Sequence, residues 1–511
     1  MAAKTIMIDM DGMTLEKLVK IARQGAQVKL TEGSEQRLRD TRRLIQTWVE
    51  EERIIYGVTT GFGALSDVVI SKKDTRRLQQ NILMSHAAGV GEPLDEETVR
   101  AVMALRIQDL ARGHSGIRLE TVEHLIALLN WGACPVIPQK GSVGASGDLA
   151  PLAHLALVLV GLGEAFYKGQ KMTGQQVLSK CGLHPIQLEA AEGLALVNGT
   201  QVMTAIGALA VNDAVHFSKL IDIAAAMSLE VLMGSRTEFN ARIHAIRPHP
   251  GQAAAADNME RLVRNSEIIT SHRDCGRVQD AYTLRCSPQV HGATKDAVNY
   301  CRKVIEIEMN SSTNNPLIYA ANQDFLLGGN FHGQPVALAM DFLSMAVAEL
   351  ANISERRIER LVNPMLSGLP AFLVGDGGLN SGFMIAQYTA AALVSENKVL
   401  CHPASVDSIP TSANKEDHVS MGTIAARQCR EVVNNTRDVV AIELLCAAQA
   451  LDLFTNLKPG EGTMEAYRVI REVIPNLDCD RILSQDIAAM RELMCSGRIL
   501  AAVEKKVGKL N

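Results

Sequence analysis

Three long apolar stretches with few charged residues constrain the fold of this chain more than any other feature. They run over residues 194–232, 336–361 and 418–454. Helices of this length and composition are buried on most of their faces, so the sequence predicts a central bundle of long helices. Because one chain can hardly cover all of these surfaces by itself, we expect a homo-oligomer.

The composition also favours a mostly α fold. Hydrophobic residues make up 47% of the 511 residues and aromatic residues only 4%, so the interior consists mainly of aliphatic side chains that suit closely packed helices. Residues 1–190 are predicted to form a smaller mixed region that bears active-site loops, and residues 191–511 the bundle and a helical tail. In the first region, an amphipathic helix is expected from an N-cap at Ser34 to Glu52.

The charge balance and the cysteine pattern exclude several classes of protein. With 51 basic and 56 acidic residues the net charge is -5, which provides no basic face for nucleic acid or anionic lipid. The ten cysteines contain no Cys-x-x-Cys pair, so we expect neither a metal site nor a disulfide scaffold. A cytoplasmic protein is expected, because the amino terminus lacks a signal-peptide pattern and the apolar run 155–162 is too short to cross a bilayer.

The most informative short motif is Ala145-Ser146-Gly147. Attack of the Gly147 amide nitrogen on the Ala145 carbonyl closes a five-membered ring, and a glycine leaves that nitrogen unobstructed. Loss of water and then of the Ser146 hydroxyl gives an electrophilic exocyclic methylene, in a 4-methylidene-imidazol-5-one. By themselves, three small residues are more typical of an ordinary turn, or of a phosphate-binding turn at a helix start.

The surrounding residues favour the electrophile. Residues 141–154 read Gly-Ser-Val-Gly-Ala-Ser-Gly-Asp-Leu-Ala-Pro-Leu-Ala-His, which resembles the signature of the histidine and aromatic amino acid ammonia-lyase family. No strand-loop-helix unit ending in Lys-Ser or Lys-Thr supports a nucleotide loop. The resemblance runs from Tyr56 to residues 475–478. It implies a long-helix bundle of the ammonia-lyase type, like that of fumarase and aspartase, and a prosthetic group made from residues 145–147 without an external cofactor. It also implies a homotetramer whose sites are built from several subunits.

Elimination of ammonia from an α-amino acid removes a weakly acidic β-proton and expels a poor leaving group. An electrophile that captures the amine improves the leaving group, and a nearby base then takes the proton. The loop 56–63, Tyr-Gly-Val-Thr-Thr-Gly-Phe-Gly, is similar to the family's catalytic tyrosine loop, which assigns Tyr56 as this base. Its ordinary pKa of about 10 would have to be lowered by a cation or by donors to the phenolate. A lone tyrosine is more often structural.

Further segments in family order provide the other candidate residues. Asn198 matches an asparagine that contacts the prosthetic ring and could stabilise charge there, although by itself it could be a helix-kink amide. Tyr282 and Arg285 match a site tyrosine and arginine, and Gln279 precedes them as a further substrate-binding candidate. Arg285 is expected to bind the substrate carboxylate through two hydrogen bonds. Tyr282 and Arg285 are three positions apart, which places both on one helical face.

Two later segments complete the resemblance. Phe331, in the segment 329–333, resembles the aromatic residue that packs beside the prosthetic group. The segment 308–316 resembles a family motif that normally has aspartate where this chain has Asn314.

Two positions indicate the substrate. The pair Ser85-His86 is similar to the histidine-specific type of the family, and Glu416 stands where phenylalanine-specific relatives have an amide. A carboxylate can accept a hydrogen bond from an imidazole N–H, but beside a benzene ring it would be uncompensated and costly. The sequence therefore predicts elimination of ammonia from L-histidine to give trans-urocanate, which opens histidine degradation.

Three alternatives remain. The nearest is a phenylalanine or tyrosine ammonia-lyase, or an aromatic aminomutase, with the same electrophile and a different pocket. The segment 311–316 also suggests a lyase of the fumarase and argininosuccinate type, which would leave residues 145–147 unexplained. A non-catalytic helical scaffold is the third, and the complete set of site residues argues against it.

Overall fold

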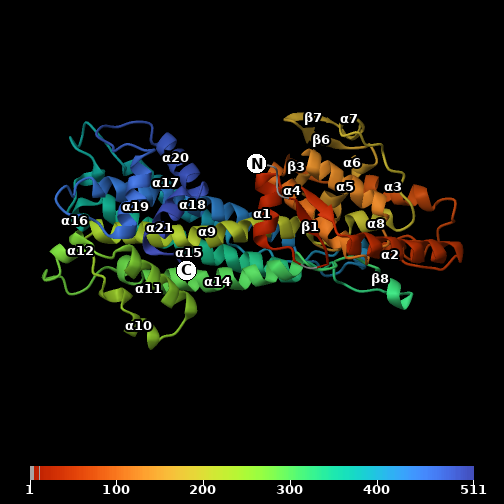
Figure 1. Cartoon of the computed structure of the whole chain (residues 1–511), viewed down its shortest axis with the longest axis horizontal. Coiled ribbons are helices and arrows are strands. Elements are labelled where there is room, and N and C mark those ends of the chain that lie inside the picture. The colour runs from red at the N-terminus through yellow and green to blue at the C-terminus, as the bar shows by residue number, and fades with distance from the viewer. Residues whose placement is uncertain (1–4, 11) are drawn as a thin grey trace. The chain divides into compact units, whose positions relative to one another are not determined.

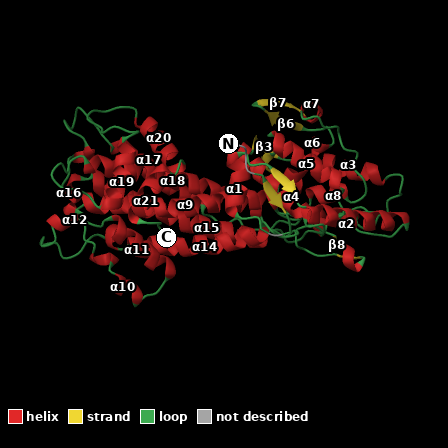
Figure 2. Ribbon diagram, in the orientation of Figure 1, coloured by secondary structure: helices red, strands yellow, loops and turns green. Residues whose placement is uncertain are grey.

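The computed structural model describes residues 5–10 and 12–511 of the chain. These residues fall into two compact units. Unit 1 combines Met1–Asn212, Arg302–Asp341 and Pro403–Gln428, and unit 2 combines Asp213–Cys301, Phe342–His402 and Cys429–Asn511. Helices dominate both units (Figure 2), which confirms the predicted mostly α fold. The division predicted between residues 190 and 191 is a different one and stays a prediction.

Four long helices, which Figure 1 labels, contribute residues to both units. Three of them coincide largely with the apolar stretches that the sequence singles out, and the fourth, α14, carries too many polar residues to stand out in the sequence. They are α9 (Gln201–Val231), α14 (Ser287–Glu308), α15 (Gln334–Val362) and α18 (Gly422–Leu451).

The first apolar stretch is not one helix, as predicted, but two. Helix α8 (Glu192–Val197) ends at Asn198, and α9 begins at Gln201. Between them Gly199 has a φ of +140°, a conformation that interrupts the helix and that residues with a side chain rarely adopt. The break matters for the site described below, because the Gly199 backbone bonds to residues 146 and 148 instead of continuing the helical hydrogen bonds.

Within unit 2, the long helices are joined by a buried ion pair. Arg357 of α15 donates from Nε and Nη2 to the two carboxylate oxygens of Glu443 of α18, at 2.6 and 2.9 Å. Ser228 of α9 and Ser354 of α15 donate their hydroxyls to the same carboxylate, at 2.8 and 2.6 Å. All four side chains are buried. A carboxylate satisfied in this way fixes the relative register of three helices.

A second buried group ties α9 to α14 in the same unit. The Asp222 carboxylate lies 2.7 Å from His291 Nδ1 and 3.0 Å from Lys295 Nζ. Burial alone would raise the pKa of Asp222, but Lys295 and His291 lower it below its usual value. The carboxylate therefore stays charged and keeps its two partners.

Unit 1 surrounds short strands with helices. Strands β1 and β2 pair in parallel. The antiparallel pairs are β3 with β5, β4 with β6, β6 with β7, and β8 with β9. The helices of this unit besides α8 are α1 (Leu15–Gln24), α2 (Glu32–Glu50), α3 (Thr75–His86), α4 (Glu96–Ala111), α5 (Leu119–Trp131), α6 (Leu149–Leu159) and α7 (Gly174–Lys180). The strands are β1 (Ile6–Ile8), β2 (Val28–Leu30), β3 (Val90–Pro93), β4 (Cys134–Pro135), β5 (Pro138–Lys140), β6 (Glu164–Tyr167), β7 (Gln170–Thr173), β8 (Leu317–Tyr319) and β9 (Asp324–Leu326).

The N-cap predicted for α2 is wrong by three residues. Thr31 caps this helix, because its hydroxyl accepts a hydrogen bond from the Ser34 amide at 3.2 Å. Ser34 lies in the first turn instead, where its buried hydroxyl donates to the Ile8 carbonyl of β1. Thr31 and Ser34 are both residue types that favour an N-cap. Because Ser34 is hydrogen-bonded to β1, Thr31 caps the helix.

The remaining helices of unit 2 are short or of moderate length. They are α10 (Ala241–Ala245), α11 (Pro250–Leu262), α12 (Glu267–Ser271), α13 (Tyr282–Arg285), α16 (Pro364–Ser367), α17 (Met384–Leu400), α19 (Glu461–Arg471), α20 (Leu483–Cys495) and α21 (Arg498–Val507). Most of them share one hydrophobic core with α9, α15 and α18, to which α10 and α16 contribute no buried residue.

Helix α15 has the length and composition of a membrane span, the one such helix among the described residues. Buried positions make up 61% of its most apolar 18-residue window. Buried core helices of globular proteins have the same composition.

Replacing Arg357 with Met should destabilise unit 2, because it leaves the Glu443 carboxylate buried without a charged partner. Breaking a buried ion pair in this way costs about 3–5 kcal/mol. We expect a clearly lower urea midpoint of unfolding by circular dichroism, and partial recovery in the R357M/E443L double variant, which removes both charges. A single variant as stable as the wild type would show that this pair does not hold the helices together.

Candidate active site

A buried aspartate fixes the loop that contains Ala145, Ser146 and Gly147. The carboxylate of Asp148 accepts hydrogen bonds from the hydroxyls of Ser142, at 3.0 Å, and Thr423. Its other oxygen accepts from the first amides of α9, those of Val202 and Met203, at 2.9 and 2.8 Å. Burial raises the pKa of Asp148, and these four hydrogen bonds oppose the rise. One side chain thus joins the loop to the starts of α9 and α18.

The backbone of the loop also pairs with the break between α8 and α9. The Gly199 amide donates to the Ser146 carbonyl at 3.2 Å, and the Asp148 amide donates to the Gly199 carbonyl at 2.7 Å. Gly147 lies between these two hydrogen bonds with a φ of +74°. A Cβ atom at this position would overlap the Gly199 carbonyl. Only glycine therefore fits at residue 147.

Ser146 lies beside the predicted substrate-binding glutamate. Its hydroxyl donates to Glu416 Oε1 at 3.2 Å, and the Thr411 hydroxyl donates to Oε2 at 3.1 Å. Thr411 and Glu416 also exchange backbone hydrogen bonds around a tight loop. The positive φ angles of 51° to 65° at residues 412–414 strain this loop. Such strain is common where a backbone must hold a functional side chain in place.

Tyr56 lies in the same unit and close to Glu416. Its hydroxyl accepts a hydrogen bond from the Gly63 amide at 3.1 Å, so the loop 56–63 closes on its own first residue. Two of its three glycines, Gly57 and Gly63, have positive φ angles, as expected for an unusual loop. Burial and the charge of Glu416 raise the pKa of Tyr56, while the Gly63 amide opposes the rise. The net shift is opposite to the one that a catalytic base requires.

His86 ends helix α3 beside the tyrosine loop. Its ring lies 5.0 Å from that of Phe62, measured between centroids, and its Nδ1 lies 2.8 Å from the Ile82 carbonyl oxygen. Burial lowers the pKa of His86, whereas Ile82 and Glu416 raise it. The imidazole is therefore mainly neutral at pH 7 and sits in the field of the Glu416 carboxylate.

Asn198 and Phe331 belong to the same unit. Asn198 ends α8, and its buried side-chain oxygen makes no hydrogen bond among the described residues. Phe331 is half-buried in the loop before α15, where its neighbour His332 stacks on His418, two residues after Glu416. Asn314 is buried, and its side-chain oxygen accepts from the Asn315 amide at 2.9 Å. An aspartate could accept the same hydrogen bond.

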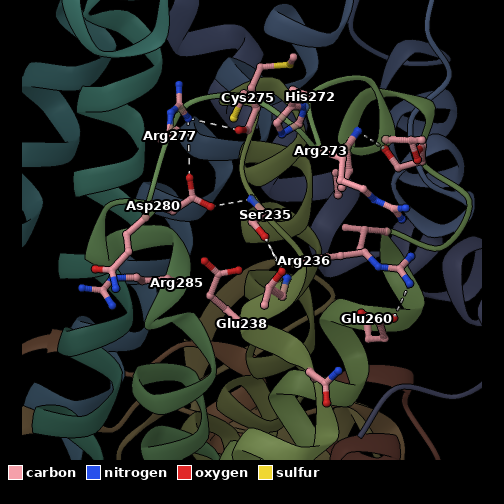
Figure 3. A pocket seen from close by; sticks show the side chains of 18 of the residues that line it. Ser235, Arg236, Glu238, Glu260, His272, Arg273, Cys275, Arg277, Asp280 and Arg285 are labelled. Atoms are coloured by element: carbon pink, nitrogen blue, oxygen red, sulfur yellow. Dashed lines mark hydrogen bonds and ion pairs between the residues drawn. The ribbon is translucent and has the colours of Figure 1, made fainter.

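The other three candidates lie in unit 2. Gln279 and Arg285 line a cavity of about 650 Å³ (Figure 3). The Arg285 guanidinium lies 4.5 Å from the centre of the Tyr282 ring, which confirms that the two residues share a helical face. Its buried Nε makes no hydrogen bond within the described part of the chain. In the same cavity Asp280 accepts from the Ser235 amide at 2.5 Å, which fixes the loop before α13.

The structure thus groups the predicted residues into two sets. Tyr56, His86, Ser146 and Glu416 are linked by contacts or charge interactions in unit 1, where Asn198 and Phe331 also lie. The set in unit 2 consists of Gln279, Tyr282 and Arg285.

Sequence reasoning missed several residues that shape the first set. Asp148 was part of the recognised motif without an assigned role, although an acid directly before an apolar helix is a typical signal for a helix start. Phe62 and Thr411 gave no signal, since their contacts with His86 and Glu416 join segments that are far apart in the chain.

A family model described as aromatic amino acid lyase matches residues 13–472. The chain belongs to this family. A curated histidine ammonia-lyase of Alkaliphilus oremlandii is 56% identical over 504 residues, covering 99% of both chains. One of Alkaliphilus metalliredigens is 54% identical over 507 residues, covering 99% of this chain and 100% of the relative. The family expected from residues 141–154 is therefore confirmed.

Solved structures of the family share the fold. A histidine ammonia-lyase from Trypanosoma cruzi matches with a TM-score of 0.92 and 43% identity, over 98% of this chain and 95% of that one. A tyrosine aminomutase from Streptomyces globisporus matches with a TM-score of 0.94 and 38% identity, over 99% and 100%. Since relatives with different activities have the same fold, the substrate depends on side chains in the site.

The Glu416→Gln substitution should lower the pKa of His86 further, because it removes the negative charge that favours the imidazolium. The measurement is an NMR titration of ¹³C-histidine-labelled protein, with H86Q as the variant that assigns the signal. An unchanged or higher pKa in E416Q would show that the two side chains do not interact.

Proposed function

We propose that this chain eliminates ammonia from L-histidine and releases trans-urocanate. The observation that carries the proposal is the position of Glu416, whose carboxylate accepts a hydrogen bond from Ser146 and acts on the charge of His86. A carboxylate beside the reacting position suits an imidazole N–H and disfavours a phenyl ring. The names of the curated relatives agree with this substrate.

We further propose that Ala145, Ser146 and Gly147 form a 4-methylidene-imidazol-5-one group. The residues fit the group in two respects. Only glycine can stand at position 147, and the Gly147 amide makes no hydrogen bond in the described part of the chain, so its nitrogen is free to react. In addition, the side-chain oxygen of Asn198 is buried without a hydrogen-bond partner among the described residues, so it is available to a group formed beside it. When formed, the group supplies an electrophilic carbon for the substrate amine.

The chain's own residues then bind the substrate and move the proton. Glu416 accepts from the imidazole N–H of the substrate, and the neutral His86 ring lies in the same pocket. Tyr56 takes the β-proton. Its raised pKa makes this difficult in the free chain, and the positive charge of the substrate ammonium acts in the opposite direction. Arg285 binds the substrate carboxylate with its guanidinium, whose Nε makes no hydrogen bond within the described residues.

We propose that the enzyme is a homotetramer in which another copy supplies Gln279, Tyr282 and Arg285 to each site, as the family resemblance implies. An apolar stripe on α15 supports association of copies. Leu338, Phe342 and Met345 are 42–50% exposed at successive turns of one face, and large exposed apolar patches commonly mark subunit interfaces. The ten cysteines are free thiols, which supports a cytoplasmic location.

Ultraviolet monitoring of the purified enzyme with L-histidine, L-phenylalanine and L-tyrosine in parallel tests this function. We expect a conjugated acrylate product from histidine alone, and none in S146A, whose circular dichroism spectrum should match that of the wild type. Turnover of phenylalanine or tyrosine would agree with the proposed electrophile but contradict the proposed specificity for histidine. Near-normal turnover in S146A would contradict the electrophile.

The E416Q variant tests the pocket separately. Because a hydrogen bond to a charged group contributes about 1.5–3 kcal/mol, kcat/KM for histidine should fall about 10–100-fold. The mass of the chain should not change beyond the substitution, since Glu416 is not part of the group. Unchanged kinetics would remove Glu416 from the substrate site.

A further inference from the structure

We infer that Arg106 is a positioning residue for the formation of the prosthetic group: its guanidinium holds the turn at Asn198 and Gly199 against Gly147, so that the loop can close into a ring. The inference rests on the proposed function, because it assumes that residues 145–147 cyclise. All residues involved belong to unit 1.

Arg106 is buried without any exposed surface in helix α4. Its Nη1 donates to the Asn198 carbonyl at 2.8 Å and to Gln201 Oε1 at 2.6 Å, and its Nη2 donates to the Ala195 carbonyl at 2.7 Å. Both carbonyls lie at the end of α8, where free carbonyl groups carry partial negative charge. One cation thus holds the last turn of α8 and, through Gln201, the first residue of α9.

The side chain of Gln201 extends this support. Its amide nitrogen donates to Asp109 Oδ2 at 3.1 Å and to the Thr313 hydroxyl at 2.8 Å. Asp109 in turn lies 3.2 Å from Arg106 Nη2. The guanidinium therefore has a carboxylate partner and acceptors for both of its terminal nitrogens, which offset the cost of burying its charge.

Gly199 is packed between this cluster and the loop. A Cβ atom at Gly199 would lie 2.5 Å from Gln201 Oε1 and 2.8 Å from Arg106 Nη1. On the opposite side, a Cβ at Gly147 would overlap the Gly199 carbonyl. The backbone of Gly199 therefore cannot shift towards Arg106, and Gly147 cannot shift towards Gly199.

Ring closure needs this rigidity. The Gly147 nitrogen forms a bond to the Ala145 carbonyl carbon and its proton passes to the oxygen, which leaves as water together with the amide proton of Ser146. A second water takes the Ser146 hydroxyl and α-proton. No oxidant is required. The Gly147 nitrogen and the Ala145 carbonyl carbon must approach each other well inside van der Waals contact. A loop whose backbone is already fixed loses less entropy on reaching this geometry than a mobile loop, and it therefore reacts faster.

Arg100 provides a matched control on the same helix. It is also buried, and it donates to two backbone carbonyls, those of Ile21 and Leu129, at 3.0 and 3.1 Å. Neither acceptor belongs to the loop or to the turn at Gly199. R100M therefore loses comparable hydrogen bonds without touching the proposed support.

The experiment measures the intact mass of freshly purified, folded full-length wild type, R106M, R106K and R100M. We call a chain mature when residues 145–147 have formed the group, and a mature chain lacks the mass of two water molecules. With charge-assisted hydrogen bonds contributing about 1.5–3 kcal/mol each, the mature fraction should fall about tenfold or more in R106M. It should fall less in R106K, which keeps the charge but cannot reach all three acceptors, and stay complete in R100M.

A complete mass deficit in folded R106M overturns the inference. If R106M does not fold, R106K decides, because it retains the charge beside Asp109: an incomplete deficit in its soluble, folded fraction supports the role, and a complete one contradicts it. An equal loss in R100M also overturns the inference, since the effect would then be general. Absence of the deficit from the wild type is a separate result, because it removes the proposed group itself.

Discussion

The structure around the candidate site depends on one buried carboxylate. Asp148 accepts four hydrogen bonds, from Ser142, Thr423 and the first amides of α9. The donors belong to three segments that are distant in sequence, so the interaction can form only when the whole of unit 1 has folded. After folding, the loop 145–147 is thereby held in a conformation that requires glycine at residue 147, which keeps its backbone atoms in place for a reaction with one another.

The loop has contacts on two sides. Behind it, Gly199 and Arg106 are buried, and both terminal nitrogens of Arg106 have acceptors. In front, Ser146 faces Glu416, which is held by Thr411 and by the strained residues 412–414. The two sides share no side chain. If residues 86 and 416 bind the substrate, as proposed, a relative could change its substrate by substitutions near them without disturbing the loop. The close structural match to a tyrosine aminomutase is consistent with this.

Much of the fold was predictable because long apolar stretches can only be buried helices. The break at residues 198–200 was not, since it depends on Gly199 packing against residues 147 and 106, and periodicity carries no information about such contacts. Helix α14 was missed because it is amphipathic rather than uniformly apolar. Among the candidate site residues, motifs singled out Tyr56, Ser146 and Glu416. The raised pKa of Tyr56 could not be predicted, because it follows from burial and from a charge supplied by a remote segment.

The central claim is that residues 145–147 of this chain become the electrophile. Tandem mass spectrometry of the peptide that contains residues 141–154, released from the wild-type protein, tests it most directly. The account predicts that the peptide lacks two water molecules and that fragment ions place the whole deficit between Ala145 and Gly147. A peptide of full mass with an intact Ser146, obtained from protein that eliminates ammonia from histidine, would contradict it.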